Sequence, residues 1–273
     1  MTPASQRRFR IAAVQMVSTP VVDENLAQAG RLIAQAAERG AMLVVLPEYF
    51  AIVGLSDRDK VAVRETDGGG PIQDFLSAQA VRHGVWLVGG SMPLVAGAPD
   101  KVRNSCLVYG PDGERAARYD KIHLFGFDRG EEHYDESATI EPGAEVAGFE
   151  SPLGRVGLAI CYDVRFPELF RAMGPVSLIC LPAAFTRPTG EAHWDLLVRT
   201  RAVENQCYLA AAAQGGRHAS GRLTHGHSMI VDPWGAVIDR LAEGPGVVVG
   251  EVDLDHMAAI RASLPALGHR RLV

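Results

Sequence analysis

Three side chains with the chemistry of acyl transfer stand where strand-like segments of the chain end. Glu48 closes "MLVVLPEYF", Lys121 follows a strand-like segment in "RYDKIHLF", and Cys161 ends the apolar run of "VGLAICYDVRFPELF". Because ligands of α/β folds bind at the carboxyl ends of the strands, we expect the three side chains to meet at one sheet edge. A carboxylate base, a cation that stabilises an oxyanion and a thiol nucleophile are the parts that acyl transfer requires.

Each of these residues also has a simpler structural interpretation. Cys161 could be a small core residue, because free cysteine is among the most buried residue types. Glu48 could be a solvated carboxylate at a strand end, and Lys121 a surface cation. The position of Cys161 in a turn between a strand and a helix start favours function, since a helix N-terminus stabilises a thiolate.

A histidine base would define a different class of enzyme, with a papain-like Cys-His pair. The candidate bases are His123, His193, His225 and His227, and no spacing singles out one of them. A serine hydrolase is not indicated, because "GHSMI" lacks the G-x-S-x-G pattern. The "HGH" at 225–227 would place two imidazoles on one strand face without a third ligand, so we expect no metal.

The elements that must position these residues follow an α/β pattern. In the first two thirds of the chain, helical stretches such as residues 23–39, with Asp23 as N-cap, separate strand-like segments. This alternation favours parallel strand pairs. Residues 225–254 instead indicate strand, turn, strand, glycine-rich loop and strand, which is an antiparallel meander. Since no linker or repeat interrupts the pattern, residues 1–273 are predicted to form a single α/β domain.

Composition and charge narrow the class of partner. The chain carries 27 basic and 32 acidic residues, a net charge of −5 and a pI near 6.0. It has no basic run that could follow a phosphate backbone, so we expect neither nucleic acid nor a membrane as partner. "DGGGP" at 67–71 lacks the pattern of a phosphate loop and is interpreted as a turn before a helix near Pro71. Four well-separated cysteines predict a reduced, cytoplasmic protein.

The motifs around Glu48, Lys121 and Cys161 resemble those of the nitrilase superfamily of carbon-nitrogen hydrolases, over nearly the whole chain. Within it, "TGEAHWDLLVRTRAVENQCYLAAAAQGGRH" (189–218) and "HGHSMIVDPWG" (225–235) resemble the Nit branch, and most closely its amidases that hydrolyse deaminated glutathione. The resemblance implies a four-layer αββα sandwich that dimerises through helices. It also implies that neither a metal nor an organic cofactor takes part.

The resemblance also assigns roles to individual residues. Cys161 would be the nucleophile, Glu48 the general base and then acid, and Lys121 the stabiliser of the oxyanion. Glu136, in "YDESATIEPG", matches a second glutamate that assists the site in this family. The backbone N–H of Tyr162 is expected to join Lys121 at the oxyanion.

Three further residues are candidate contacts of the substrate. Arg165 could pair with a substrate carboxylate, or it could brace the sheet edge through Asp163 or Glu168. Phe185 and Thr189 match family positions that face the acyl pocket, although Phe185 could equally be a core residue.

The hypothesis that results is a thiol amidase. It would cleave deaminated glutathione to 2-oxoglutarate and Cys-Gly through a cysteine thioester. An ω-amidase that acts on α-ketoglutaramate, or on another small amide, is the alternative within the same chemistry. A non-catalytic binding or scaffold protein is a distant alternative, and the intact set of Glu48, Lys121, Glu136 and Cys161 argues against it.

Overall fold

Helices separate strands at the beginning of the chain and again between residues 159 and 207, but the described residues between 86 and 158 carry successive strands without an α-helix between them, so the predicted alternation holds only in part. The computed structural model describes residues 7–129 and 132–272. The strands are β1 (Arg8–Gln15), β2 (Leu43–Val45), β3 (Trp86–Val88), β4 (Met92–Val95), β5 (Val102–Tyr109), β6 (Arg115–Asp120), β7 (Gly126–Arg129), β8 (Glu132–Asp135), β9 (Gly148–Ser151), β10 (Gly154–Leu158), β11 (Leu178–Ala183), β12 (Tyr208–Ala213), β13 (Ser228–Val231), β14 (Val237–Leu241) and β15 (Gly246–Asp253). The α-helices are α1 (Val22–Glu38), α2 (Asp59–Ala62), α3 (Pro71–His83), α4 (Pro167–Ala172), α5 (Arg187–Asn205) and α6 (Leu254–Ser263), and the 3₁₀ helices are η1 (Glu136–Ala138), η2 (Cys161–Arg165) and η3 (Ala266–His269).

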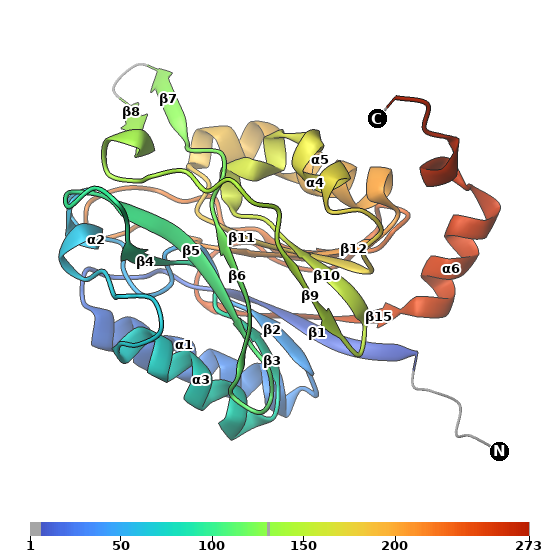
Figure 1. The fold of residues 1–273 in the computed structure, drawn as a ribbon, viewed down its shortest axis with the longest axis horizontal. Coiled ribbons are helices and arrows are strands. Elements are labelled where there is room, and N and C mark those ends of the chain that lie inside the picture. The colour runs from blue at the N-terminus through green and yellow to red at the C-terminus, as the bar shows by residue number, and fades with distance from the viewer. Residues whose placement is uncertain (1–6, 130–131, 273) are drawn as a thin grey trace.

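Two sheets pack face to face and are covered by helices on their outer faces, which gives the predicted αββα sandwich (Figure 1). The seven-stranded sheet has the order β15-β1-β2-β3-β5-β4, with β6 paired to β5, and α1 and α3 cover it. The six-stranded sheet has the order β14-β13-β12-β11-β10-β9, and α4 and α5 cover it. A separate hairpin is formed by β7 and β8.

The apolar character of the strands follows from their burial on both faces. In β1, Ile11 and Ala13 join a core cluster that includes Leu158 of the opposite sheet. The alternate residues Ala12 and Val14 belong to a second cluster, which contains the buried faces of α1 and α3. Because both faces of the strand are covered, the sequence reads as a continuous apolar run without polar alternation.

The last strand lies in a different sheet from the one that the sequence predicts. β13 and β14 pair antiparallel, as expected of a meander. β15, however, pairs antiparallel with β1 along all eight residues, from Arg8 opposite Asp253 to Gln15 opposite Gly246. Val248 of β15 is buried in the core between the sheets, so the strand gains a full ladder and a buried face by crossing over. The prediction of a three-stranded meander is therefore wrong for its third strand.

The two predicted helix starts agree with the observed ones to within one residue. α1 begins at Val22, and Asp23 lies in its first turn and is not the N-cap. The loop before α1 is held by Asn25, whose side chain accepts a hydrogen bond from the Thr19 N–H at 2.8 Å. α3 begins at Pro71, as predicted. Proline suits the first position of a helix, because an N–H there would have no acceptor within the helix.

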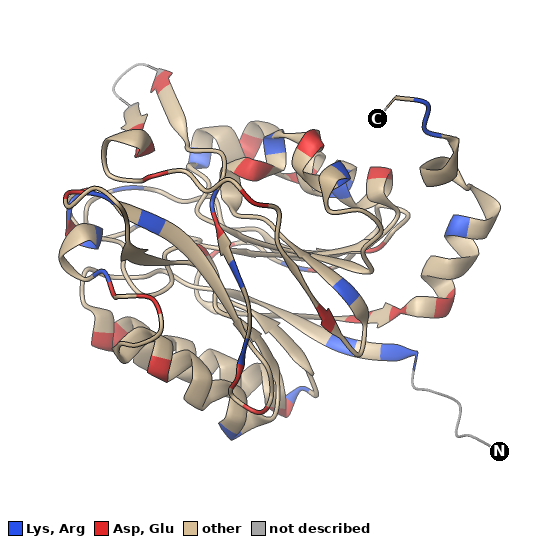
Figure 2. Ribbon diagram, in the orientation of Figure 1, with Lys and Arg blue, Asp and Glu red and all other residues tan. Residues whose placement is uncertain are grey.

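Charged residues of both signs are interspersed over the two sheets and the helices that cover them (Figure 2). All four cysteines are buried and unpaired. Within residues 7–129 and 132–272, no helix combines the length and apolarity that crossing a membrane needs.

Candidate active site

Glu48, Lys121 and Cys161 come together from two sheets. Glu48 lies three residues after β2 and Lys121 directly follows β6, both in the seven-stranded sheet, whereas Cys161 lies three residues after β10 in the six-stranded sheet. Their relative exposures are only 1%, 1% and 7%. The prediction that the three side chains meet at the edge of one sheet is therefore wrong. The site forms where the ends of strands from two facing sheets meet.

The Lys121 ammonium joins two buried carboxylates. Its Nζ lies 2.8 Å from Oε1 of Glu48 and 2.7 Å from Oε2 of Glu136. Asn104 Nδ2 donates to the same oxygen of Glu48 at 3.0 Å, and the Tyr49 hydroxyl donates to Glu136 Oε1 at 2.8 Å. Neither Asn104 nor Tyr49 was predicted from the sequence as part of the site. Tyr49 could have been predicted because it follows Glu48 directly in the sequence. Asn104 lies inside β5, and its sequence context does not indicate a place in the site.

The charges of this cluster are set by one another. Burial by itself lowers the pKa of the Lys121 ammonium, but the carboxylates of Glu136 and Glu48 outweigh it and raise that pKa above its usual value. Burial acts to raise the pKa of Glu136, yet the Lys121 charge and the hydrogen bonds from Lys121 and the Phe125 N–H hold it below its usual value. At neutral pH, Lys121 and Glu136 are therefore both ionised.

Cys161 is held in a strained turn by a buried carboxylate. Its φ of 50° is in the left-handed region, which a non-glycine residue rarely adopts. Asp163, two residues on, accepts hydrogen bonds from the Ile160 N–H at 2.8 Å, the Tyr119 hydroxyl at 2.7 Å and the His123 N–H at 3.1 Å. The role of Asp163 could have been predicted from its place two residues after the candidate nucleophile, because aspartate side chains commonly accept hydrogen bonds from free N–H groups in turns.

The resting state of Cys161 is a neutral thiol. The sequence instead predicts a thiolate, stabilised by the N-terminus of a helix. Burial raises the pKa of this thiol well above its usual value, and Glu48 raises it further, while Lys121 and a backbone hydrogen bond involving Ala184 act in the opposite direction. η2 is a five-residue 3₁₀ turn, too short for a strong helix dipole. Proton removal must therefore accompany attack on the substrate.

A pocket opens above the Cys161 thiol. Its lining comprises Glu48, Phe125, Glu136, Cys161, Tyr162, Arg165, Ala184, Phe185, Thr186, Thr189 and Arg222. All three predicted substrate contacts are therefore at the pocket, and so is Tyr162, the expected donor to an oxyanion.

Arg165 is held above the pocket by aromatic side chains. Its guanidinium lies 5.3 Å from the ring centre of Phe185, and its Nη1 lies 3.3 Å from Nδ1 of His193. Asp163, one of the two bracing partners considered for Arg165, gives both carboxylate oxygens to other donors. Phe185 also packs on Trp194 with ring centres 4.8 Å apart, so it is both a core residue and a wall of the pocket.

The histidines considered as bases lie outside this pocket. His123 has its Nδ1 2.7 Å from Asp163 and its ring stacked on another aromatic side chain, and His193 is exposed. The rings of His225 and His227 stack on each other, and burial together with the neighbouring His227 lowers the pKa of His225 to about 4. Among the described residues, no group of three or more histidine, cysteine or acidic side chains is placed to hold a metal ion.

Comparison with known proteins places the chain in a family. The profile of the carbon-nitrogen hydrolase family matches residues 10–262. A deaminated glutathione amidase of Yersinia enterocolitica is 40% identical over 98% of this chain and 94% of its own length. An omega-amidase of Xenopus tropicalis is 39% identical over 97% of this chain and 95% of its own length. Nit3 of Saccharomyces cerevisiae, a member of branch 10 of the nitrilase superfamily, superposes with a TM-score of 0.87 at 30% identity and covers 98% of each chain.

The fold and the pocket define a hydrolase of carbon-nitrogen bonds with a cysteine at its centre. The chain belongs to the carbon-nitrogen hydrolase family, in the Nit branch of the nitrilase superfamily. It is an amidase, as the sequence analysis predicted.

Proposed function

We propose that this amidase cleaves deaminated glutathione to 2-oxoglutarate and Cys-Gly through a thioester on Cys161. The observation that carries the chemistry is the buried cluster of Glu48, Lys121 and Glu136 beside the pocket of Cys161. The observation that favours the substrate is the 40% identity to the Yersinia enterocolitica enzyme along almost the entire chain.

The first half of the proposed reaction forms the thioester. Glu48 takes the proton of Cys161 while the sulfur attacks the amide carbonyl, because the buried thiol does not ionise by itself. The carbonyl oxygen becomes an oxyanion between the Lys121 ammonium and the Tyr162 backbone N–H. The carbon-nitrogen bond then breaks, and protonated Glu48 gives its proton to the departing amine.

The second half releases the acid. Glu48 removes a proton from water, the resulting hydroxide attacks the thioester carbonyl, and the sulfur leaves and recovers a proton from Glu48. Throughout, Glu136 keeps Lys121 charged and positioned through their 2.7 Å ion pair. We place Arg165 on the carboxylate of the acyl portion, since it lines the pocket beside Phe185 and Thr189.

The experiment that tests this function compares two substrates of the purified protein. Deaminated glutathione should release Cys-Gly with the higher kcat/KM, and α-ketoglutaramate should release ammonia more slowly, with Cys161→Ala as the blank. Faster turnover of α-ketoglutaramate would make the protein an ω-amidase, the alternative that the omega-amidase relative supports. If neither substrate turns over while Cys161 still forms covalent adducts, the mechanism stands and the substrate does not.

Replacing Glu48 by glutamine is expected to slow acylation of Cys161 by about 10³-fold, a size typical of general-base catalysis. Glutamine keeps an oxygen that can accept from Lys121 and Asn104, so the fold is retained while the base is lost. Single-turnover mass spectrometry of the acyl adduct measures the rate.

The matched control is His193→Gln, which should keep most of the wild-type acylation rate at saturating substrate. A papain-like base at His193 would reverse the two results, and one at His123 would leave acylation rapid in both variants. A scaffold protein without activity would show no acyl adduct in the wild type.

We propose further that residues 1–273 act as a single domain, that two copies form a dimer and that the protein works in the cytoplasm. The four unpaired cysteines support a reducing compartment. For the dimer, the supporting feature is a set of exposed apolar side chains, with Leu196 of α5 67% exposed, Val203 of α5 47% exposed and Trp234 63% exposed; Val203 lies beside Gly235, the residue that follows Trp234. Light scattering should give a two-chain mass that Leu196→Asp lowers to one chain.

A further inference from the structure

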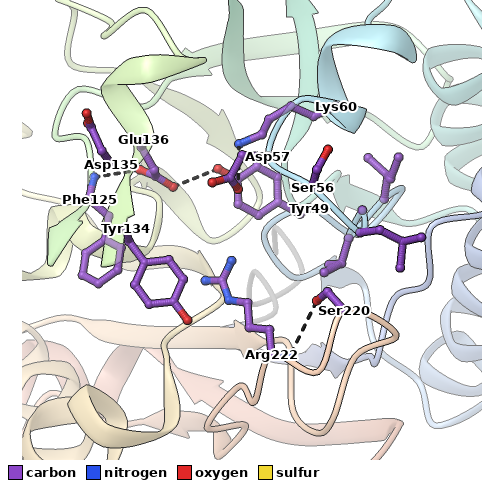
Figure 3. Close-up of a pocket in the computed structure, with 14 residues that line it drawn as sticks. Tyr49, Ser56, Asp57, Lys60, Phe125, Tyr134, Asp135, Glu136, Ser220 and Arg222 are labelled. Atoms are coloured by element: carbon purple, nitrogen blue, oxygen red, sulfur yellow. Dashed lines mark hydrogen bonds and ion pairs between the residues drawn. The ribbon is translucent and has the colours of Figure 1, made fainter. Parts of the chain in front are cut away.

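A second cavity adjoins the pocket of Cys161. It has a volume of about 280 Å³, and it shares Phe125, Glu136 and Arg222 with that pocket. Figure 3 shows Lys60 and Arg222 reaching into it from opposite sides. The cavity therefore continues the active-site pocket past Glu136, and Arg165 lines the pocket but not the cavity.

Arg222 brings a cation into the cavity without an acidic partner. Its Nη2 donates to the Ala184 carbonyl oxygen at 3.1 Å, and its guanidinium lies 5.1 Å from the ring centre of Tyr134. Within the described part of the chain, its buried Nε has no hydrogen-bond partner and no ion pair includes it. Because the guanidinium charge has no carboxylate partner among those residues, an anion that entered the cavity beside Arg222 would be stabilised.

Lys60 is the second cation, and its charge is only weakly balanced. Its side chain is 11% exposed, and its Nζ lies 5.4 Å from the ring centre of Tyr49. The carboxylate of Asp57 is 3.8 Å away, and that side chain is 67% exposed to solvent. Burial lowers the pKa of Lys60, an effect that the charges of Asp57 and Glu136 only partly offset.

The other acidic side chains of the cavity are already engaged. Glu136 binds the Lys121 ammonium, and Asp135 accepts hydrogen bonds from the N–H and the hydroxyl of Ser137. The cavity thus presents two cations whose charges are incompletely balanced, because among the ion pairs of the described residues Lys60 has only the exposed Asp57 as a partner and Arg222 has no carboxylate partner. Two convergent cations in a partly buried cavity bind a carboxylate well, because its charge is screened little there.

We propose that Lys60 and Arg222 form a subsite for a carboxylate carried by the amine leaving group. This inference rests on the proposed function and specifies its substrate class. The acyl portion occupies the pocket of Arg165, so a substrate that extends past Glu136 does so with its leaving group. Ammonia would leave this cavity empty of any charged ligand, whereas a dipeptide amine such as Cys-Gly places its terminal carboxylate in it.

Three substrates with the same acyl group test the subsite. They are deaminated glutathione, its analogue with the glycine carboxylate capped as a carboxamide, and α-ketoglutaramate. Lys60→Met and Arg222→Met should each lower the ratio of kcat/KM for deaminated glutathione to that for α-ketoglutaramate by about 10-fold or more, mainly through KM. Arg217→Met, an exposed arginine of the same loop outside both cavities, is the matched control and should keep the wild-type ratio.

The capped analogue separates charge recognition from a general structural effect. The wild type should cleave it about 10-fold less efficiently than the free acid, and Lys60→Met should add no further loss, because the charge that Lys60 binds is already absent. Equal losses on deaminated glutathione and α-ketoglutaramate in both variants would overturn the subsite while leaving the proposed function intact. A wild type that cleaves none of the three substrates would overturn the proposed function and this inference together.

Discussion

Replacing Cys161 by alanine is expected to lower kcat/KM on deaminated glutathione by about 10⁴-fold or more, the size of loss seen when a covalent nucleophile is removed. The thioester cannot form without the sulfur, and the remaining site only polarises the carbonyl. Turnover assays measure the loss, and mass spectrometry should show that the acyl adduct of the wild type is absent from the variant.

The control for this variant is Cys207→Ala, which removes a thiol from the core. Burial raises the pKa of the Cys207 thiol to about 12, and Cys106, Cys180 and Cys207 have no exposed surface. A small alkylating amide should therefore modify Cys161 alone, and Cys207→Ala should retain its activity. Modification of another cysteine at the same rate, or persistent turnover in Cys161→Ala, would contradict the assignment of the nucleophile.

Lys121→Met is expected to reduce both activity and stability. Activity should fall by about 10³-fold, because the oxyanion loses its cationic partner. The free energy of unfolding should fall by about 3–5 kcal/mol, the cost of leaving a buried charge unpaired. Both carboxylates bound by Lys121 are affected, since Glu48 has 1% and Glu136 14% of its side-chain surface exposed. Urea unfolding followed by circular dichroism measures the stability.

The pH dependence distinguishes lost charge pairing from lost packing. In the wild type the pKa of Glu136 is depressed, so its ionised form contributes stability above the unfolded pKa of about 4.3, and this contribution is lost as pH falls. Without Lys121 the pKa of Glu136 should rise, so the variant should become more stable as pH falls from about 8 to about 5. Its deficit against the wild type should therefore shrink over that range.

Lys101→Met is the matched control for this experiment. The Lys101 ammonium donates to the Ser137 carbonyl oxygen at 2.7 Å and is paired with no carboxylate among the ion pairs of the described residues. Its loss should cost about 1 kcal/mol or less, with no marked change between about pH 8 and about pH 5. An equal, pH-independent loss in Lys121→Met would show that packing and not charge pairing holds the cluster together.

Local patterns predicted most of the elements and the fold class. The continuous apolar runs predicted β1, β2 and β10, because strands covered on both faces have no polar side. The glycine-rich turn before Pro71 predicted the start of α3. The four-layer arrangement was predicted only from the resemblance to a family, because local patterns do not show how many sheets the strands form. β15 shows why, because its choice between β14 and β1 depends on which partner gives a longer ladder and a buried face.

The amino-acid sequence by itself determined which chemical groups this protein has and where strands end beside them. Glu48, Lys121 and Cys161 are candidates because each stands at the end of a strand-like segment, and Glu136 is one because its motif resembles that of the family. These are properties of short stretches of chain, so they can be found without knowing how distant segments pack.

Only the tertiary structure decided that two facing sheets bring these residues together, and that Asn104, Tyr49 and Asp163 hold them. The charge states also arise there, because a pKa depends on burial and on charges from distant parts of the chain. The cavity of Lys60 and Arg222 is likewise tertiary, since its walls are 162 residues apart in the sequence.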